Sequence, residues 1–300
     1  MIEKTPLRHV PSQLGIVVAF AAAVLCIPTP GFATPILAAD LATFVVLGAS
    51  GVTNVATSTI GGNLGSAPNP SVDGGYSFTS GSLQANTPIA QNAQVQLDAA
   101  ILALDTFGVG TTIGSSLDTW QSGHGGFITP GTYTVSADPT ANLTGNLLLN
   151  GLGSNSAVWV FQFPSTLVTS TISNVTVTNV GDGANVGIYW NVHSAATLNG
   201  PTFAGNVLAN TLISSDGNLT IECGRLLSAN SQVTLNQDKV SITGCAAFTT
   251  PPNGGTNPSP NPGFGGGQVP VPEPTTLILL ASGLVGGAMR IKRRIGSRRP

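Results

Sequence analysis

Short apolar runs separated by turn residues recur along most of the chain, and this pattern predicts β-strands. From about residue 40 to residue 84, runs such as FVVLG alternate with breaks rich in glycine and asparagine. Beyond residue 157 the runs recur in three groups whose period is about one solenoid coil. The first group comprises 158–163, 187–192, 205–210 and 224–230, the second 165–171, 194–200, 211–217 and 231–237, and the third 174–179, 218–223 and 239–245. Because one coil cannot bury its own apolar face and stacked coils can, we predict a β-solenoid.

Residues 87–107 break this rhythm and predict one long amphipathic helix along one side of the solenoid. Thr87 is a good N-cap, Pro88 suits the first helical position, and Gly108 can end the helix. About 20 residues make a helix about 30 Å long, which would lie alongside about six strands spaced by roughly 4.8 Å. The stretch that follows is interpreted as a glycine-rich loop with a turn at 129–131. Apolar residues share one face of the helix at helical spacing: Ala90, Ala93, Leu97, Ala100, Ile101 and Leu104.

Both ends of the chain have the composition of processing segments. Residues 1–39 combine two cations, the apolar run 14–27 and then small residues, which is the order of a secretory signal peptide. A membrane anchor is the alternative, but the apolar run is shorter than the roughly 20 residues that a spanning helix needs. Residues 249–270 are rich in proline and glycine and predict an extended linker. One all-β domain over residues 40–248 remains between them.

Residues 271–300 form the second processing segment. It holds Pro272, Glu273 and Pro274, then an apolar run over 275–289 that would enter the membrane, then a basic tail. Cations after an apolar run mark the cytoplasmic side. The segment resembles the PEP-CTERM protein-sorting signal, which implies a Gram-negative cell, a sorting system linked to exopolysaccharide, and a membrane protease that cuts near the tripeptide. An ordinary tail anchor is the alternative.

Charge is scarce in the predicted domain. Charged residues make up 7% of the chain, and only Arg225 and Lys239 carry positive charge between the two terminal segments. Against these two cations stand ten acids from Asp40 to Asp238, a net charge of −8. Nucleic-acid binding is therefore excluded, because the phosphates would meet no cationic surface.

Two cysteines remain once Cys26 leaves with the signal peptide. Cys223 and Cys245 end the third strands of consecutive coils, so stacking would bring them to about the strand separation, which a disulfide can span. Paired cysteines are usual in an exported protein. We expect this bond to clamp the last coil to its neighbour and to protect an end of the solenoid.

The stretches 44–54, 60–72, 128–135, 143–163 and 186–236, together with the helix, resemble the microbial ice-binding proteins. The resemblance covers nearly all of residues 40–245. It implies a discontinuous right-handed β-solenoid with an α-helix packed along one side. It also implies that ice, or an ordered water surface, is the partner.

Ice has no charge or pocket to recognise, so its receptor must be a flat, rigid array that orders water. Threonine suits this task, because its methyl group excludes loose water, its hydroxyl holds ordered water and its χ1 angle is stiff. Hydroxyls are densest in the second strand group, which also contains Ser194 and Ser231, and Thr57 and Thr59 could extend it. Threonine is also common on any solvated β face, and Ala195 and Leu212 interrupt the array. The candidate ice-binding residues are Thr166, Thr169, Thr171, Thr197, Thr211, Ser214 and Thr234.

The sequence favours no catalytic residue, metal or cofactor. A polysaccharide-cleaving solenoid would need clustered carboxylates beside a cation, and no such cluster adjoins Arg225 or Lys239. His124 and His193 lack metal-ligand spacing, and the Asp-Gly pairs at 182–183 and 216–217 are typical of turns. The alternative to ice binding is a non-catalytic structural or adhesive module of the extracellular polysaccharide matrix.

Overall fold

The computed structural model describes residues 35–137, 141–181, 183 and 185–242. The predicted signal peptide, linker and sorting signal, including Pro272, Glu273 and Pro274, lie outside these residues, apart from 35–39. Within the described ranges, no helix has the length and apolar character needed to cross a membrane.

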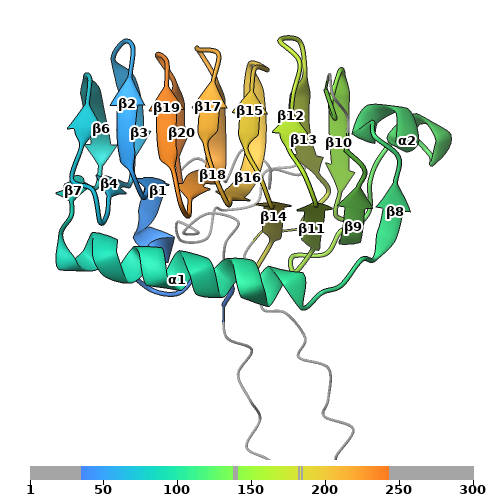
Figure 1. Ribbon diagram of the computed structural model, residues 1–300. Helices are drawn as coiled ribbons and strands as arrows, with labels where there is room; N and C mark the ends of the chain where they lie inside the picture. The colour runs from blue at the N-terminus through green and yellow to red at the C-terminus, as the bar shows by residue number, and fades with distance from the viewer. Residues whose placement is uncertain (1–34, 138–140, 182, 184, 243–300) are drawn as a thin grey trace, which may run out of the picture. The chain divides into compact units, whose positions relative to one another are not determined.

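The described chain winds into coils that stack parallel strands into three faces (Figure 1). The helix-side face holds β1 (Phe44–Gly48), β4 (Asn63–Ser66), β7 (Leu83–Ala85), β8 (Thr111–Ile113), β9 (Gly131–Val135), β11 (Val158–Phe163), β14 (Gly187–Val192) and the second halves of β16 (Thr202–Ala209) and β18 (Thr220–Ser228). The six-strand face holds β12 (Leu167–Val168), β15 (Ala196–Leu198), β17 (Ile213–Ser215), β19 (Gln232–Leu235), β2 (Gly51–Asn54) and β5 (Val72–Asp73). The third face holds β10 (Asn146–Asn150), β13 (Asn174–Thr178), the first halves of β16 and β18, β20 (Lys239–Ser241), β3 (Ser58–Gly61) and β6 (Tyr76–Ser80).

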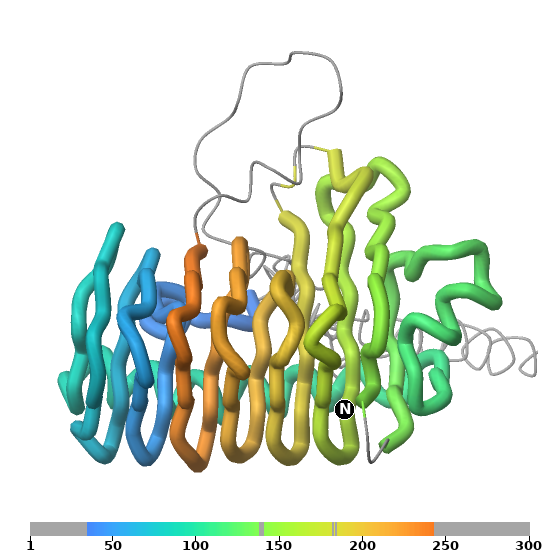
Figure 2. The backbone as a smooth tube through the Cα atoms, turned by 90° about the horizontal axis from the view of Figure 1, so that it is seen from above, coloured from blue at the N-terminus to red at the C-terminus, as the bar shows by residue number. Residues whose placement is uncertain are grey.

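The order of coils in space differs from their order in sequence. The first coil stacks on the last one, with β1 on β18, β2 on β19 and β3 on β20, all parallel. Figure 2 shows this as blue coils beside orange ones. The solenoid is therefore discontinuous, and the coil that ends at β20 lies inside the stack. The expectation that this coil forms an exposed end is wrong, because β1–β3 cover its edge.

The strand that contains Cys223 also differs from the prediction. β18 does not end at Cys223 but continues through it from the third face to the helix-side face, with φ 60° at Cys223. The side chain is fully buried. Cys245 lies outside the described residues, so the disulfide stays a prediction.

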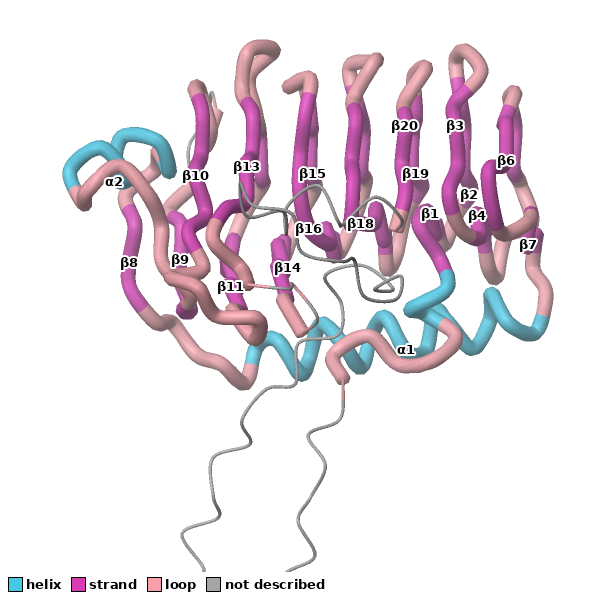
Figure 3. Tube along the Cα trace, turned by 180° about the vertical axis from the view of Figure 1, so that it is seen from behind, coloured by secondary structure: helices cyan, strands magenta, loops and turns pink. Residues whose placement is uncertain are grey.

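The long helix forms as its sequence predicts. α1 (Pro88–Asp105) begins at Pro88 with Thr87 as its N-cap, as predicted, and ends two residues before residue 107. The Thr87 Oγ1 accepts a hydrogen bond from the Ala90 N–H at 3.4 Å. It runs along the helix-side face, as Figure 3 shows from behind. Apart from the half-buried Ile101, all the predicted apolar residues are buried, and they pack against Leu47, Tyr189, Leu208 and Leu227. A 3-10 turn, η1 (Leu41–Thr43), contacts the same helix.

A second, short helix lies where a loop was expected. α2 (Leu117–Gly123) has Ser116 as its N-cap, whose Oγ accepts the Thr119 N–H at 3.3 Å. Gln121 attaches it to β10 by accepting the Leu148 N–H at 2.6 Å and donating to the Asn146 carbonyl at 3.0 Å. A helix of seven residues is weak alone, so these tertiary contacts decide its formation.

Aromatic rings stack through the core between neighbouring coils. The ring of Phe161 lies 5.6 Å from Tyr133 and 4.3 Å from Trp190, measured between centroids. Trp190 in turn lies 4.8 Å from Phe203. Such stacks fix the distance between coils, because interior packing leaves little room for adjustment. The faces outside this core therefore have a rigid foundation.

Candidate functional site

Strand register divides the six-strand face into an inward row and an outward row. The inward row is Leu167, Ala196, Ile213, Val233, Val52 and Val72, and only Val72 retains exposure. The next residue in each strand points outward because side chains alternate along a strand. This outward row, with one residue from each of six coils, is Val168, Thr197, Ser214, Thr234, Thr53 and Asp73.

Four consecutive members of the outward row carry hydroxyl groups. Their repeat follows the strand spacing of about 4.8 Å. The Ser214 hydroxyl donates to Thr197 at 3.4 Å, and the Thr53 hydroxyl donates to Thr234 at 3.2 Å. A flanking row lies on the other side of the inward row, and it is chemically mixed: Thr166, Ala195, Leu212, Gln232, Gly51 and Ser71.

The structure brings Thr197, Ser214 and Thr234 of the predicted set into one row and places Thr166 in the flanking row. The inclusion of Thr169 is wrong. Its side chain is only 1% exposed, and its Oγ1 accepts the N–H groups of Asn199 at 2.9 Å and Gly200 at 3.4 Å. Thr169 follows the inward Leu167 by two positions and therefore points to the same side.

Thr171 and Thr211 also lie outside the array. Thr171 is exposed but follows β12 in a turn. Thr211 is half-buried at the corner before β17, where its N–H donates to the Ser194 carbonyl at 3.1 Å. Its own carbonyl accepts the Ser228 hydroxyl at 2.7 Å. Neither threonine belongs to the outward row.

The residue that sequence reasoning missed is Thr53. We expected Thr57 or Thr59 to extend the array, but Thr57 lies between strands and Thr59 is on the third face beside Lys239. A signal was present, because Val52-Thr53 repeats the inward and outward pair Val233-Thr234. It has meaning only once the first coil is known to stack on the last.

Comparison with known proteins identifies the family. Residues 46–241 match the model described as "Ice-binding-like". The chain belongs to the ice-binding-like family. Residues 270–294 match the PEP-CTERM protein-sorting motif. An ice-binding protein of Nostoc sp. (strain HG1) is 35% identical over 255 residues, covering 84% of each chain. One from Colwellia sp is 30% identical over 223 residues, covering 67% of this chain and 81% of that protein.

Solved structures agree with this family. An ice binding protein from an Antarctic biological consortium is 28% identical with a TM-score of 0.58, covering 69% of this chain and 91% of that chain. The ice-binding protein from the Antarctic ascomycete Antarctomyces psychrotrophicus is also 28% identical, with a TM-score of 0.54, and the match covers 68% of this chain and 96% of that chain. The predicted solenoid with its flanking helix is thus confirmed as the fold of this ice-binding-like protein.

The third face of this ice-binding-like domain is chemically different from the six-strand face. Lys239 and Glu222 form an ion pair there, with 3.6 Å between Nζ and Oε1. Asn174 donates to the Asn146 side chain at 2.9 Å and accepts the Thr202 hydroxyl at 2.8 Å. These side chains bond to one another across coils. The ion pair thus distinguishes this face from the six-strand face, whose hydroxyl groups also bond across coils.

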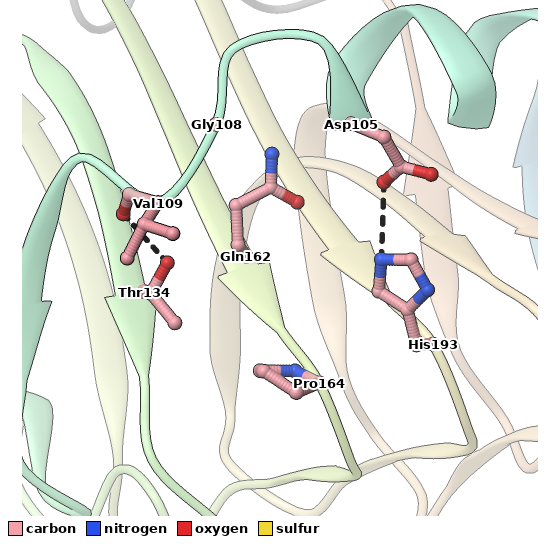
Figure 4. Close-up of a pocket in the computed structure, with 7 residues that line it drawn as sticks. All are labelled: Asp105, Gly108, Val109, Thr134, Gln162, Pro164 and His193. Carbon is pink, nitrogen blue, oxygen red and sulfur yellow. Dashed lines mark hydrogen bonds and ion pairs between the residues drawn. The ribbon is translucent and has the colours of Figure 1, made fainter.

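A shallow cavity of about 430 Å³ lies at the end of α1 (Figure 4). His193 Nε2 lies 3.0 Å from Asp105 Oδ1, and Asn191 donates to the same oxygen at 2.7 Å. His193 thus has a partner that the sequence did not reveal, whereas His124 stacks on Trp120 with centroids 3.8 Å apart. Nowhere in the described ranges do three or more His, Cys, Asp or Glu side chains gather as a metal site.

Two buried charges belong to the scaffold. Burial lowers the pKa of the Arg225 guanidinium to about 10, and this side chain donates to Asn206 and to the Ala42 carbonyl, both at 2.7 Å. Burial raises the pKa of Asp238. Hydrogen bonds to the Asp238 carboxylate from neighbouring residues oppose that rise, and they fasten the corner beyond the six-strand face.

Proposed function

We propose that this protein binds ice through the outward row of the six-strand face. The observation that carries the proposal is the row of four hydroxyl-bearing residues on four coils that are neighbours in space: Thr197, Ser214, Thr234 and Thr53. The named ice-binding relatives support ice as the partner. The choice of face rests on the geometry and chemistry of the row.

Threonine and serine at strand spacing can order water against the protein surface. The threonine methyl excludes loosely held water, while the hydroxyl holds an ordered molecule. The stiff χ1 of threonine keeps both groups at the strand repeat, which is close to a repeat in the ice lattice. The inward row beneath, which is fully buried apart from Val72, keeps the backbone of the face in place. Many weak contacts can then form at once.

Charge favours the six-strand face over the third face. Asp73, at the end of the outward row, is its single charged member. The third face carries the Lys239 and Glu222 pair near its middle. Charged groups hold hydration water in their own geometry, so a neutral row is the better template for ice.

Thr234→Tyr tests this proposal, with Thr176→Tyr as the matched control. Thr234 lies in the middle of the outward row, whereas Thr176 is exposed on β13 of the third face. The Thr234 variant should need a roughly tenfold higher concentration to stop ice recrystallisation, which corresponds to about 1.4 kcal/mol of lost binding. Both variants should keep the parent circular dichroism spectrum. Lost activity in the control with full activity in Thr234→Tyr would show that the face is misassigned.

We also infer that the protein is exported and acts at the cell surface. The sorting motif at 270–294 supports this. In this proposal residues 1–39 direct export and are removed, residues 249–270 space the domain from the membrane, and residues 275–289 hold it there until a sorting protease cuts. Intact-mass measurement of the surface form tests both ends, and retention of Met1 would refute the signal peptide. The same measurement without reductant tests the disulfide of Cys223 and Cys245.

If the unmodified domain neither shapes ice nor slows recrystallisation, the matrix-module alternative becomes the better account. Such a module would use the same rigid solenoid, low charge and export signal. Binding to the host's exopolysaccharide would then be the activity to measure. No catalytic role is proposed in either case.

A further inference from the structure

One end of the solenoid is uncovered in the described structure. The terminal coil consists of β5, β6 and β7, which pair on one side only with β2, β3 and β4. Among the described residues, no strand pairs with the other edge of any of these three strands. Three rows of backbone donors and acceptors thus end at one surface of the molecule.

The apolar core also ends at this surface. Phe78 is paired in register with Ile60, and Leu83 with Leu64. The inner pair is fully buried, whereas Phe78 is 37% exposed and Leu83 is 48% exposed. The terminal coil therefore has the inward pattern of a core layer without the next layer on top. Uncovered β edges with apolar side chains favour association.

The opposite end is covered on two of its faces. On the third face, Gln121 of α2 bonds to the backbone of β10. On the six-strand face, the Val168 carbonyl of β12 accepts the Asn142 N–H at 2.8 Å, and the Val168 N–H donates to the Asn142 side chain at 3.0 Å. The chain supplies caps at one end of the stack, and the described part of it supplies none at the other.

We propose that the terminal coil is the interface of a dimer in which two copies of this chain meet end to end. A single peptide strand could pair with only one of the three edges. Another solenoid end offers three edges and an apolar centre at once. The α2 end is already capped on two of its three faces, so the fitting partner is the same end of a second copy. A two-fold contact of this kind closes on itself and cannot grow into a fibre.

Strand lengths and charge agree with such a contact. When the two-fold axis is perpendicular to the solenoid axis, one strand of the terminal coil pairs antiparallel with its own copy. Each of the other two strands then pairs with the other one in the partner. β6 with five residues can meet itself, while β5 and β7, with two and three residues, exchange partners. Asp73 is the single charged residue between positions 70 and 86. The two ends can therefore approach with little repulsion.

Photo-crosslinking in the full-length chain tests the proposal. Benzoylphenylalanine replaces Ser77, which is exposed on β6, and the control replaces Thr176, on the same face but away from the end. Two differently tagged copies are produced together, and irradiation should join one tag to the other. We expect roughly ten times more dimer from position 77 than from position 176, with the new bond inside residues 70–86 of the partner.

Charge placed at the interface should remove the dimer. Phe78→Lys puts two like charges together near the axis and should lower the crosslink at position 77 roughly tenfold. If Phe78→Lys lowers the melting temperature, Ser80→Lys repeats the test at an exposed position of β6. Crosslinks from position 77 to the same copy, no crosslink there, or equal yields at both positions would each overturn the proposal. Ice shaping does not enter these readouts, so failure of the ice-binding assignment leaves them unaffected.

Discussion

The substitution Thr169→Val separates the inner and outer sides of the six-strand face. Threonine and valine have nearly the same shape, so the change removes a hydroxyl and leaves little void. Thr169 is 1% exposed, and its Oγ1 accepts the backbone N–H groups of Asn199 and Gly200. The variant should therefore lose stability and keep its activity on ice. The companion variant Thr197→Val changes the outward row instead.

The size of the stability loss follows from those hydrogen bonds. The Asn199 N–H lies at 2.9 Å and the Gly200 N–H at 3.4 Å, so the first bond is the stronger. Leaving a buried donor without an acceptor costs about 1–3 kcal/mol. We expect a loss of about 2 kcal/mol, which in a domain of this size lowers the melting temperature by about 4–8 °C. Thr197→Val should change the free energy of unfolding by about 0.5 kcal/mol or less.

Thermal melting and recrystallisation inhibition, measured on the same preparations, give the two readouts. Thr169→Val should melt earlier and inhibit recrystallisation at the parent concentration, because the assay temperature lies far below the melting point. Thr197→Val should melt like the parent and inhibit more weakly. The opposite result, a stable Thr169→Val with weak inhibition, would refute the inward assignment of Thr169.

Three further predictions concern the ends of the array and the helices. Asp73→Thr replaces the single charge of the outward row, so recrystallisation should stop at a lower protein concentration. Burial alone would raise the pKa of Asp118, but hydrogen bonds from neighbouring hydroxyl and N–H groups lower it. The stability that the Asp118 carboxylate contributes is therefore complete above its unfolded pKa of about 3.9 and is lost as pH falls through the lower folded pKa. Acid should loosen α2, and Trp120 fluorescence should report the change. Asp118→Asn should remove that transition. Leu97→Ala should cost about 3 kcal/mol in urea denaturation because Leu97 is fully buried on the inner face of α1. Leu102→Ala, at a side chain of the same helix that is 67% exposed, should cost little.

Local patterns in the sequence determined the elements of this protein. The alternation in runs such as 231–237 predicts a strand with one buried side, and β19 occupies Gln232–Leu235. The N-cap at Thr87 and the apolar spacing up to Leu104 predict the helix, because these signals act within one or two turns of the chain. The recurrence of three strand groups predicts stacked coils, because one coil cannot bury its own apolar face.

Only the tertiary structure decided which coils are neighbours and which side of a strand meets water. The pairing of Thr53 with Thr234 joins residues 181 positions apart, and no local signal specifies that contact. The inward place of Thr169 depends on the register of β12, because the side-chain period of a strand is two and a shift of one residue exchanges its faces. The row of hydroxyls therefore gains its fourth member, Thr53, only after the first coil has stacked on the last, where shared burial of the core sets the register.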